Sequence, residues 1–145
     1  MAPVRILGIG LDLVEIDRIR AVHRRHGSRF VDRVYTPEEQ TRIARLNDPA
    51  PYLAGRWAVK EAVMKALGTG LTGGITWQDI NVRRDPSGAP RVALSGAARG
   101  RARALGMGRI LVSITHGRDL AVAQAIGIAE EGECDFAETS SAAGT

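Results

Sequence analysis

At 145 residues with 44% hydrophobic side chains, the chain is predicted to form one domain around a single core. The single cysteine, Cys134, excludes an intramolecular disulfide, and no signal peptide or membrane-spanning stretch is recognisable, so we expect a cytoplasmic protein without membrane contact. The net charge of +4 is uneven, because residues 130–145 contain five of the sixteen acidic residues and none of the twenty basic ones. Residues 1–129 therefore carry about +9, which predicts a polyanionic partner.

In chain order, the hydrophobic periodicity predicts a strand, three helices, a strand pair, a fourth helix and a final strand pair. The predicted bounds are 4–14, 15–26, 36–47, 52–67, 75–84 with 90–94, 95–105, and 109–115 with 120–128. This order argues for an α+β fold with a mainly antiparallel sheet packed on the long central helix. We expect residues 1–129 to form the domain and the acidic residues 130–145 to be a disordered tail.

The first predicted strand carries two glycines and a carboxylate on one face, at Gly8, Gly10 and Asp12. The glycines would clear that face, so that a metal ion and a bulky phosphate group could lie beside Asp12. The alternative is that Asp12 caps the helix that follows the strand.

A second carboxylate, Glu61, follows Trp57 by four residues on the apolar stripe of the central helix. A carboxylate there is expected to be partly buried and to need a partner. The alternative is an i, i+4 ion pair with Lys65 on an exposed helix face. Two carboxylates from a strand and a helix, completed by substrate oxygens and water, are typical of a magnesium site.

Cations and glycines surround Glu61 in the sequence. Arg56, Lys60 and Lys65 lie on the same helix, which ends at Gly68-Thr69-Gly70. Such cations can clamp a polyphosphate while glycines admit the backbone close to a ligand, although a solvated helix face with a glycine C-cap is the alternative. His116 ends a later strand and is either structural or, near a phosphate, a hydrogen-bond donor or proton carrier.

Three blocks of the sequence resemble the holo-acyl carrier protein synthase family in their order and spacing. They are residues 8–16 (GIGLDLVEI), 56–70 (RWAVKEAVMKALGTG) and 113–116 (SITH). The resemblance extends over residues 4–129, with Trp57 and Val59 at positions where the family commonly has Phe and Ala. It implies the 4′-phosphopantetheinyl transferase fold.

The resemblance also implies an activity and its site. The family transfers the 4′-phosphopantetheine group of coenzyme A to a serine of apo acyl carrier protein in fatty acid biosynthesis, releasing adenosine 3′,5′-bisphosphate. By this resemblance Asp12 and Glu61 hold Mg²⁺, and Glu61 and Lys65 are catalytic. The expected general base is Glu61, and the alternative is a metal-bound water acting through it. The expected contacts to coenzyme A are Arg56, Lys60, Lys65, Gly68, Thr69, Gly70 and His116.

Acyl carrier proteins are acidic, so the basic helix that follows the first strand is the expected docking face. Its arginines are Arg18, Arg20, Arg24 and Arg25, and Arg18 most resembles the family's carrier-contacting arginine. The family is also trimeric, with active sites between protomers. Two rival functions remain, a non-enzymatic basic module that binds nucleic acid and another magnesium-dependent phosphotransferase or nuclease. The 4% aromatic content argues against the first, so we expect no nucleic-acid partner.

Overall fold

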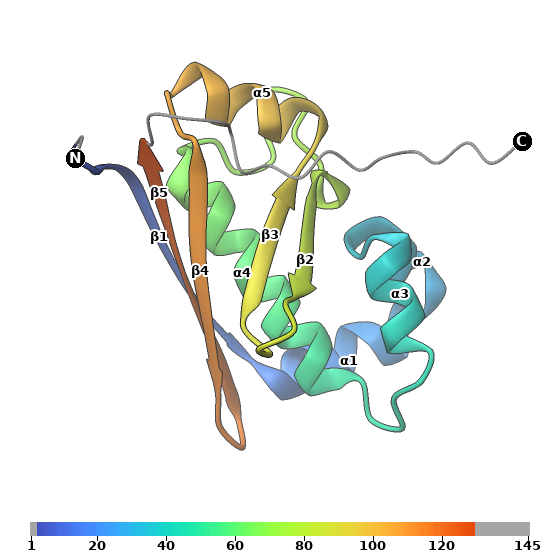
Figure 1. Cartoon of the computed structure of the whole chain (residues 1–145). Coiled ribbons are helices and arrows are strands. Elements are labelled where there is room, and N and C mark those ends of the chain that lie inside the picture. The colour runs from blue at the N-terminus through green and yellow to red at the C-terminus, as the bar shows by residue number, and fades with distance from the viewer. Residues whose placement is uncertain (1–2, 130–145) are drawn as a thin grey trace, which may run out of the picture.

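A computed structural model describes residues 3–129, and the predicted acidic tail lies outside these residues. These residues form five α-helices and five strands, whose arrangement can be followed in Figure 1. They are β1 (Arg5–Glu15), α1 (Ile16–His26), α2 (Ser28–Val34), α3 (Pro37–Ile43), α4 (Ala50–Leu67), β2 (Ile80–Arg84), β3 (Pro90–Leu94), α5 (Gly96–Ala104), β4 (Arg109–His116) and β5 (Leu120–Ala129), with a 3-10 turn at Trp77–Asp79.

Two antiparallel sheets enclose the central helix. One sheet has the strand order β1-β5-β4, and the other is the β2–β3 hairpin. Helix α4 lies between the two sheets, and helices α1 to α3 gather at one end of the molecule (Figure 1). The predicted α+β fold with mainly antiparallel strands is therefore confirmed.

Helix α4 is buried on almost every side. Thirteen of its eighteen residues are buried, so the predicted single apolar stripe understates the contacts that it makes. A helix that is apolar nearly all round belongs in the middle of a fold. Pro51 is tolerated in its first turn, and Gly68 ends the helix in the left-handed conformation, with a φ of 73°.

The glycines of β1 serve this packing. A Cβ atom at Gly8 would overlap the carbonyl oxygen of Ala66, and one at Gly10 would overlap that of Ala62. The glycines therefore let α4 approach the sheet closely. The expectation that they leave room for a phosphate is wrong, because the helix fills that space.

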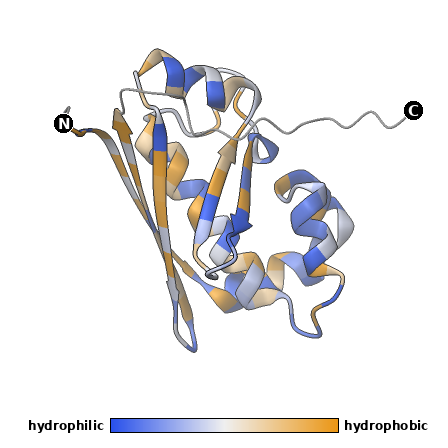
Figure 2. Cartoon of the chain, in the orientation of Figure 1, coloured by the Kyte–Doolittle hydropathy of each residue, from blue (hydrophilic) through white to orange (hydrophobic). Residues whose placement is uncertain are grey.

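The other face of β1 is apolar and open to solvent. Ile9, Leu11 and Leu13 are 63%, 60% and 59% exposed. Ile126 of β5 pairs with Ile9 of β1 on one side and with Leu111 of β4 on the other, so Ile9 and Leu111 lie in one row across the sheet. We call Ile9, Leu11, Leu13 and Leu111 the outer sheet face, and Figure 2 shows hydrophobic colour along these strands.

The helices at the end of the fold differ in part from the prediction. The Thr36 capping box with Glu39 forms as expected, but α3 ends at Ile43 rather than near residue 47. Helix α2 was not predicted, because Gly27 indicates a stop and the chain resumes a helix directly after it. Within residues 3–129, no helix has the combination of length and apolar character that crossing a membrane requires.

Candidate active site

The two carboxylates singled out in the sequence meet in the fold. Asp12 on β1 and Glu61 on α4 line one pocket of 270 Å³, together with Lys65 and Arg18. Burial raises the pKa of the Glu61 carboxyl above its ordinary value, and the negative charge of Asp12 raises it further, while Lys65 opposes the rise. We call this cavity the carboxylate pocket.

Lys65 fixes Asp12 within this pocket. Its Nζ donates hydrogen bonds to the carbonyl oxygen of Leu11 at 2.8 Å and to Oδ1 of Asp12 at 3.1 Å. The alternative pairing of Lys65 with Glu61 on an exposed face is therefore not adopted. Nor does Asp12 cap α1, whose N-cap residue is Glu15. Both acids remain available for a ligand.

The donor set of the carboxylate pocket suits magnesium. Among the described residues, no group of three or more His, Cys, Asp or Glu side chains is gathered as a metal site. Zinc usually requires at least three protein ligands, whereas magnesium takes one or two carboxylates and completes its shell with phosphate and water. Asp12 and Glu61, with like charges close enough to interact, fit the second pattern.

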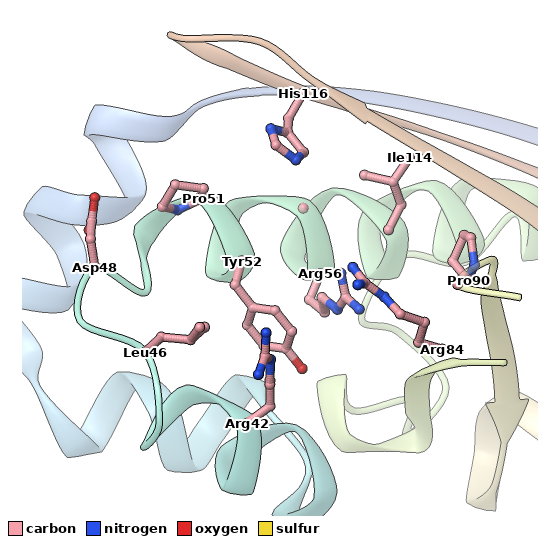
Figure 3. A pocket seen from close by; sticks show the side chains of 12 residues that line it. Arg42, Leu46, Asp48, Pro51, Tyr52, Arg56, Arg84, Pro90, Ile114 and His116 are labelled. Carbon is pink, nitrogen blue, oxygen red and sulfur yellow. The ribbon is translucent and has the colours of Figure 1, made fainter. Parts of the chain in front are cut away.

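Arg56 and His116 lie in a different pocket, of 340 Å³, which Figure 3 shows from close by. The Arg56 guanidinium lies 4.3 Å from the centre of the Tyr52 ring, and its buried Nε has no hydrogen-bond partner among residues 3–129. Burial lowers the pKa of Arg56. Arg42 of α3 and Arg84 of β2 line the same cavity. Four side chains that can carry positive charge make this cationic pocket suitable for an anion.

The two pockets lie on different sides of α4. Arg56 and Glu61 are five residues apart, and each residue turns an α-helix by about 100°, so their side chains point about 140° apart. Within one chain the fold therefore does not bring Arg56 and His116 to Asp12 and Glu61. The sequence offered no signal for Arg42 and Arg84, because only the packing of α3 and the hairpin against α4 brings them in.

Lys60 is placed where it cannot meet a ligand. Its side chain is 0% exposed and its Nζ lies 2.7 Å from Oε1 of Glu39, which is equally buried. The predicted contact of Lys60 with coenzyme A is therefore corrected. A lysine on a solvated helix face or in a phosphate clamp must have an exposed ammonium group. The Lys60 side chain instead points from α4 into the interior, toward Glu39 of α3 and Ile80 of β2.

The glycine loop after α4 lines neither pocket. Gly68 closes the helix and Gly70 also has a positive φ, of 56°. The Thr69 hydroxyl donates to the carbonyl oxygen of Gly70 at 3.2 Å. The C-cap predicted from the sequence is present, and a contact of Gly68, Thr69 and Gly70 with coenzyme A stays a prediction.

The predicted docking arginines separate into two groups. Arg18 is exposed and lines the carboxylate pocket, and Arg24 and Arg25 are exposed in the last turn of α1. Arg20 instead forms an ion pair with Asp48 at 2.6 Å, which lowers the pKa of that carboxyl. Arg20 therefore ties α1 to the chain that precedes α4.

A further pocket that the sequence did not indicate adjoins the carboxylate pocket, and apolar side chains line it together with His26, Arg29 and Arg33. It has a volume of 510 Å³ and shares Val22, Phe30 and Trp57 with its neighbour. The Trp57 ring lies 4.3 Å from the Trp77 ring, centre to centre. The scattered aromatic residues of the sequence thus gather here in space.

An α+β fold with two carboxylates in one pocket beside a basic helix suits a protein that acts on a phosphate-containing substrate. The sequence model of a protein family described as "4′-phosphopantetheinyl transferase superfamily" matches residues 8–125. The chain therefore belongs to this family. The holo-[acyl-carrier-protein] synthase of Nitratidesulfovibrio vulgaris is 52% identical over 121 residues, which cover 83% of this chain and 97% of that protein. The resemblance seen in the sequence is thereby confirmed.

Solved structures agree with this relationship. The holo-[acyl-carrier-protein] synthase of Neisseria meningitidis superposes with a TM-score of 0.80 at 32% identity, covering 88% of this chain and all 100% of that one. The holo-(acyl-carrier-protein) synthase of Bacillus anthracis, in complex with CoA (3′,5′-ADP), gives a TM-score of 0.73 at 31% identity over 86% of this chain and 98% of that one.

Proposed function

We propose that this chain transfers the 4′-phosphopantetheine group of coenzyme A to a serine of apo acyl carrier protein, releasing adenosine 3′,5′-bisphosphate, as a cytoplasmic step of fatty acid biosynthesis. The observation that carries the proposal is the meeting of Asp12, Glu61 and Lys65 in one pocket of this family's fold. The relatives named holo-[acyl-carrier-protein] synthase, and the related structure in complex with CoA, support the substrates.

The residues of the carboxylate pocket have separate roles in this reaction. Asp12 and Glu61 would hold Mg²⁺, which when bound would offset negative charge on the phosphates of coenzyme A. The serine oxygen attacks the phosphorus that carries the pantetheine arm, and the bond from that phosphorus to the adenosine bisphosphate breaks. Glu61 accepts the serine proton, directly or through a water molecule. Lys65 holds Asp12 in place and offers its exposed ammonium to the phosphates.

The cationic pocket supplies the second part of the coenzyme A site. Arg56 and His116 contact the phosphates of the nucleotide, joined by Arg42 and Arg84. Because these residues lie on another side of α4 from Glu61, one chain alone does not complete the site. A homotrimer with active sites between protomers would join a carboxylate pocket to a neighbour's cationic pocket. The apolar outer sheet face, formed by Ile9, Leu11, Leu13 and Leu111, supports such self-association.

The carrier docks on α1. Arg18 is exposed at the edge of the carboxylate pocket, so an acidic carrier bound there would present its serine to Glu61. Arg24 and Arg25 extend the positive surface along the helix. Arg20 contributes less, since Asp48 already neutralises it.

The decisive experiment incubates the protein with coenzyme A, Mg²⁺ and an apo acyl carrier protein, and measures the intact mass of the carrier. The expected result is a phosphopantetheinyl adduct on serine that is lost when Mg²⁺ is chelated. A nucleic-acid-binding module or a phosphotransferase of another substrate class gives no adduct. Absence of the adduct with several apo carriers would therefore reject the proposal.

A further inference from the structure

We propose that the buried ion pair between Lys60 and Glu39 positions the active site, by fixing the rotation of α4 that directs Glu61 and Lys65 toward Asp12. This inference rests on the proposed function, which assigns chemistry to the carboxylate pocket. It gives Lys60 a role that replaces the corrected contact with coenzyme A. Neither Lys60 nor Glu39 lines the carboxylate pocket, so both would act on it through α4, which carries Glu61.

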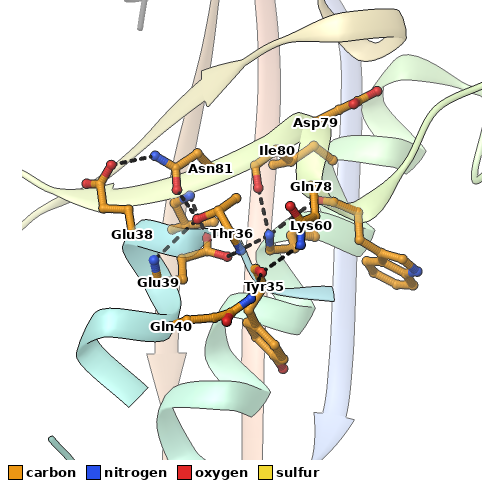
Figure 4. A network of polar contacts seen from close by, with 12 residues as sticks. Tyr35, Thr36, Glu38, Glu39, Gln40, Lys60, Gln78, Asp79, Ile80 and Asn81 are labelled. Atoms are coloured by element: carbon orange, nitrogen blue, oxygen red, sulfur yellow. Dashed lines mark hydrogen bonds and ion pairs between the residues drawn. The ribbon is translucent and has the colours of Figure 1, made fainter. Parts of the chain in front are cut away.

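Every polar group of the pair has a partner, as Figure 4 shows. The Lys60 ammonium has three hydrogens, and its Nζ lies 2.7 Å from Glu39 Oε1, 2.7 Å from the carbonyl oxygen of Ile80 and 3.2 Å from that of Trp77. Glu39 accepts hydrogen bonds from the backbone N–H of Thr36 at 2.9 Å and of Val82 at 2.8 Å. The geometry of the pair is therefore determined from both ends.

These bonds join three parts of the fold at one point. Glu39 lies on α3, Lys60 on α4, and the carbonyl and N–H partners on the 3-10 turn and β2. Because the bonds are directional and lie in a dry interior, they hold α4 at one rotation about its axis. Glu61 is the next residue and points about 100° further round the helix, so its direction follows from that of Lys60.

On the side of α4 that faces β1, the polar bonds come from Lys65, whose side chain is about half exposed, so they constrain the helix less than the fully buried Lys60 does. Ala62 and Ala66 meet Gly8 and Gly10 of β1 on the same side, in a contact that involves no polar side chain. This contact sets the separation between helix and sheet but makes no directional bond. A buried ion pair also adds little stability over an apolar pair of the same volume, so specifying one arrangement is the better account of its presence.

The test compares Glu39→Gln, Lys60→Met and the double variant, with Glu38→Gln as a matched control. Glu38 is the neighbour of Glu39 on α3 and forms an exposed ion pair with Arg83 at 3.1 Å. Four quantities are measured, namely kcat, KM for coenzyme A, Tm, and the near-ultraviolet circular dichroism of Trp57 and Trp77 without substrate or metal. The tryptophan signal reports rotation of α4, because Trp57 lies on α4 and its ring stacks near that of Trp77.

Each single variant should lose about 10- to 100-fold in kcat, the usual effect of removing a residue that orients a ligand-binding side chain. Each should also have a lower Tm, since a buried charge loses its partner. The double variant should recover Tm but keep the low kcat and an altered tryptophan signal, because the bonds from Nζ are still missing. The Glu38→Gln control should match the wild type in all four.

A purely structural pair would behave differently. If the double variant recovered wild-type kcat and tryptophan signal together with Tm, or if the single variants changed Tm alone, the positioning role would be refuted. Failure of the proposed function is distinguishable, because the wild type would then give no pantetheinyl adduct at all. The substrate-free tryptophan signal would still report whether the pair fixes α4.

Discussion

Lys60 and Glu61 are adjacent residues on α4, yet the fold treats their charges in opposite ways. Lys60 is fully buried and meets a carboxylate and two carbonyl oxygens. Glu61 is partly buried beside a second carboxylate, and no hydrogen bond or ion pair within residues 3–129 neutralises it. A buried charged side chain whose hydrogen-bonding groups all have protein partners, such as Lys60, has a structural role. A charged side chain without such partners in the wall of a pocket, such as Glu61, can bind a ligand.

Removing either carboxylate should have the largest effect on activity. Asp12→Asn and Glu61→Gln keep the side-chain shape but remove a ligand charge, so we expect kcat to fall by about 100-fold or more with the fold retained. Adduct formation by mass spectrometry measures the rate, and circular dichroism checks the fold. Wild-type turnover of either variant at saturating Mg²⁺ would contradict the assignment of these acids as metal ligands. Glu61 would then have no functional role that distinguishes it from Lys60.

Charge reversal at the mouth of the same pocket should have an intermediate effect. We expect Arg18→Glu to raise KM for the carrier by about tenfold and to leave KM for coenzyme A nearly unchanged, because like charges then face each other at the docking surface. Steady-state kinetics with each substrate varied in turn measures both constants. Arg103→Glu on α5 is the control, since it makes the same charge change on an exposed helix elsewhere. Equal changes in both constants would reject docking on α1.

Glu61→Gln should increase the thermal stability of the metal-free protein, although the same substitution lowers activity. The change in stability should be the smaller effect. The raised pKa of Glu61 means that its ionised form is disfavoured in the folded state, so Glu61→Gln should raise Tm at neutral pH by a few degrees. The gain should shrink as the pH falls through the raised pKa and vanish below the ordinary value of about 4.3.

Thermal unfolding in a chelator at several pH values tests this prediction. The charged groups that face Glu61 are Asp12 on β1, Lys65 on α4 and Arg18 on α1. Glu15→Gln provides an exposed carboxylate as the control. If Glu61→Gln were less stable than the wild type at neutral pH, the Glu61 carboxylate would have stabilising partners in the fold, as Lys60 has.

Deleting residues 130–145 should have the smallest effect. These residues lie beyond the family match, which ends at residue 125, and we expect kcat to change by less than about twofold. The same adduct assay measures the rate, with salt varied because the deletion removes five negative charges. A large drop in kcat would assign the tail to the active site.

Much of the architecture was predictable because local signals are strong. The Thr36 capping box, the glycine cap at Gly68 and the turn between β2 and β3 each depend on a few neighbouring residues, and each is present in the fold. Helix α2 could not be predicted in the same way. Gly27 indicates a helix end, and only packing of Phe30 and Val34 into the core makes the chain resume a helix.

Short segments of the sequence were enough to predict the order of the elements apart from α2 and to single out the two acids, because periodicity and residue chemistry are local properties. Tertiary structure decided which face of α4 each charge would occupy. Three cations on one helix look alike in the sequence, yet packing buries Lys60, lines one pocket with Arg56 and sets Lys65 against Asp12. The physical reason is that a charge takes its role from the partners and the solvent around it, and contacts between distant segments alone supply these.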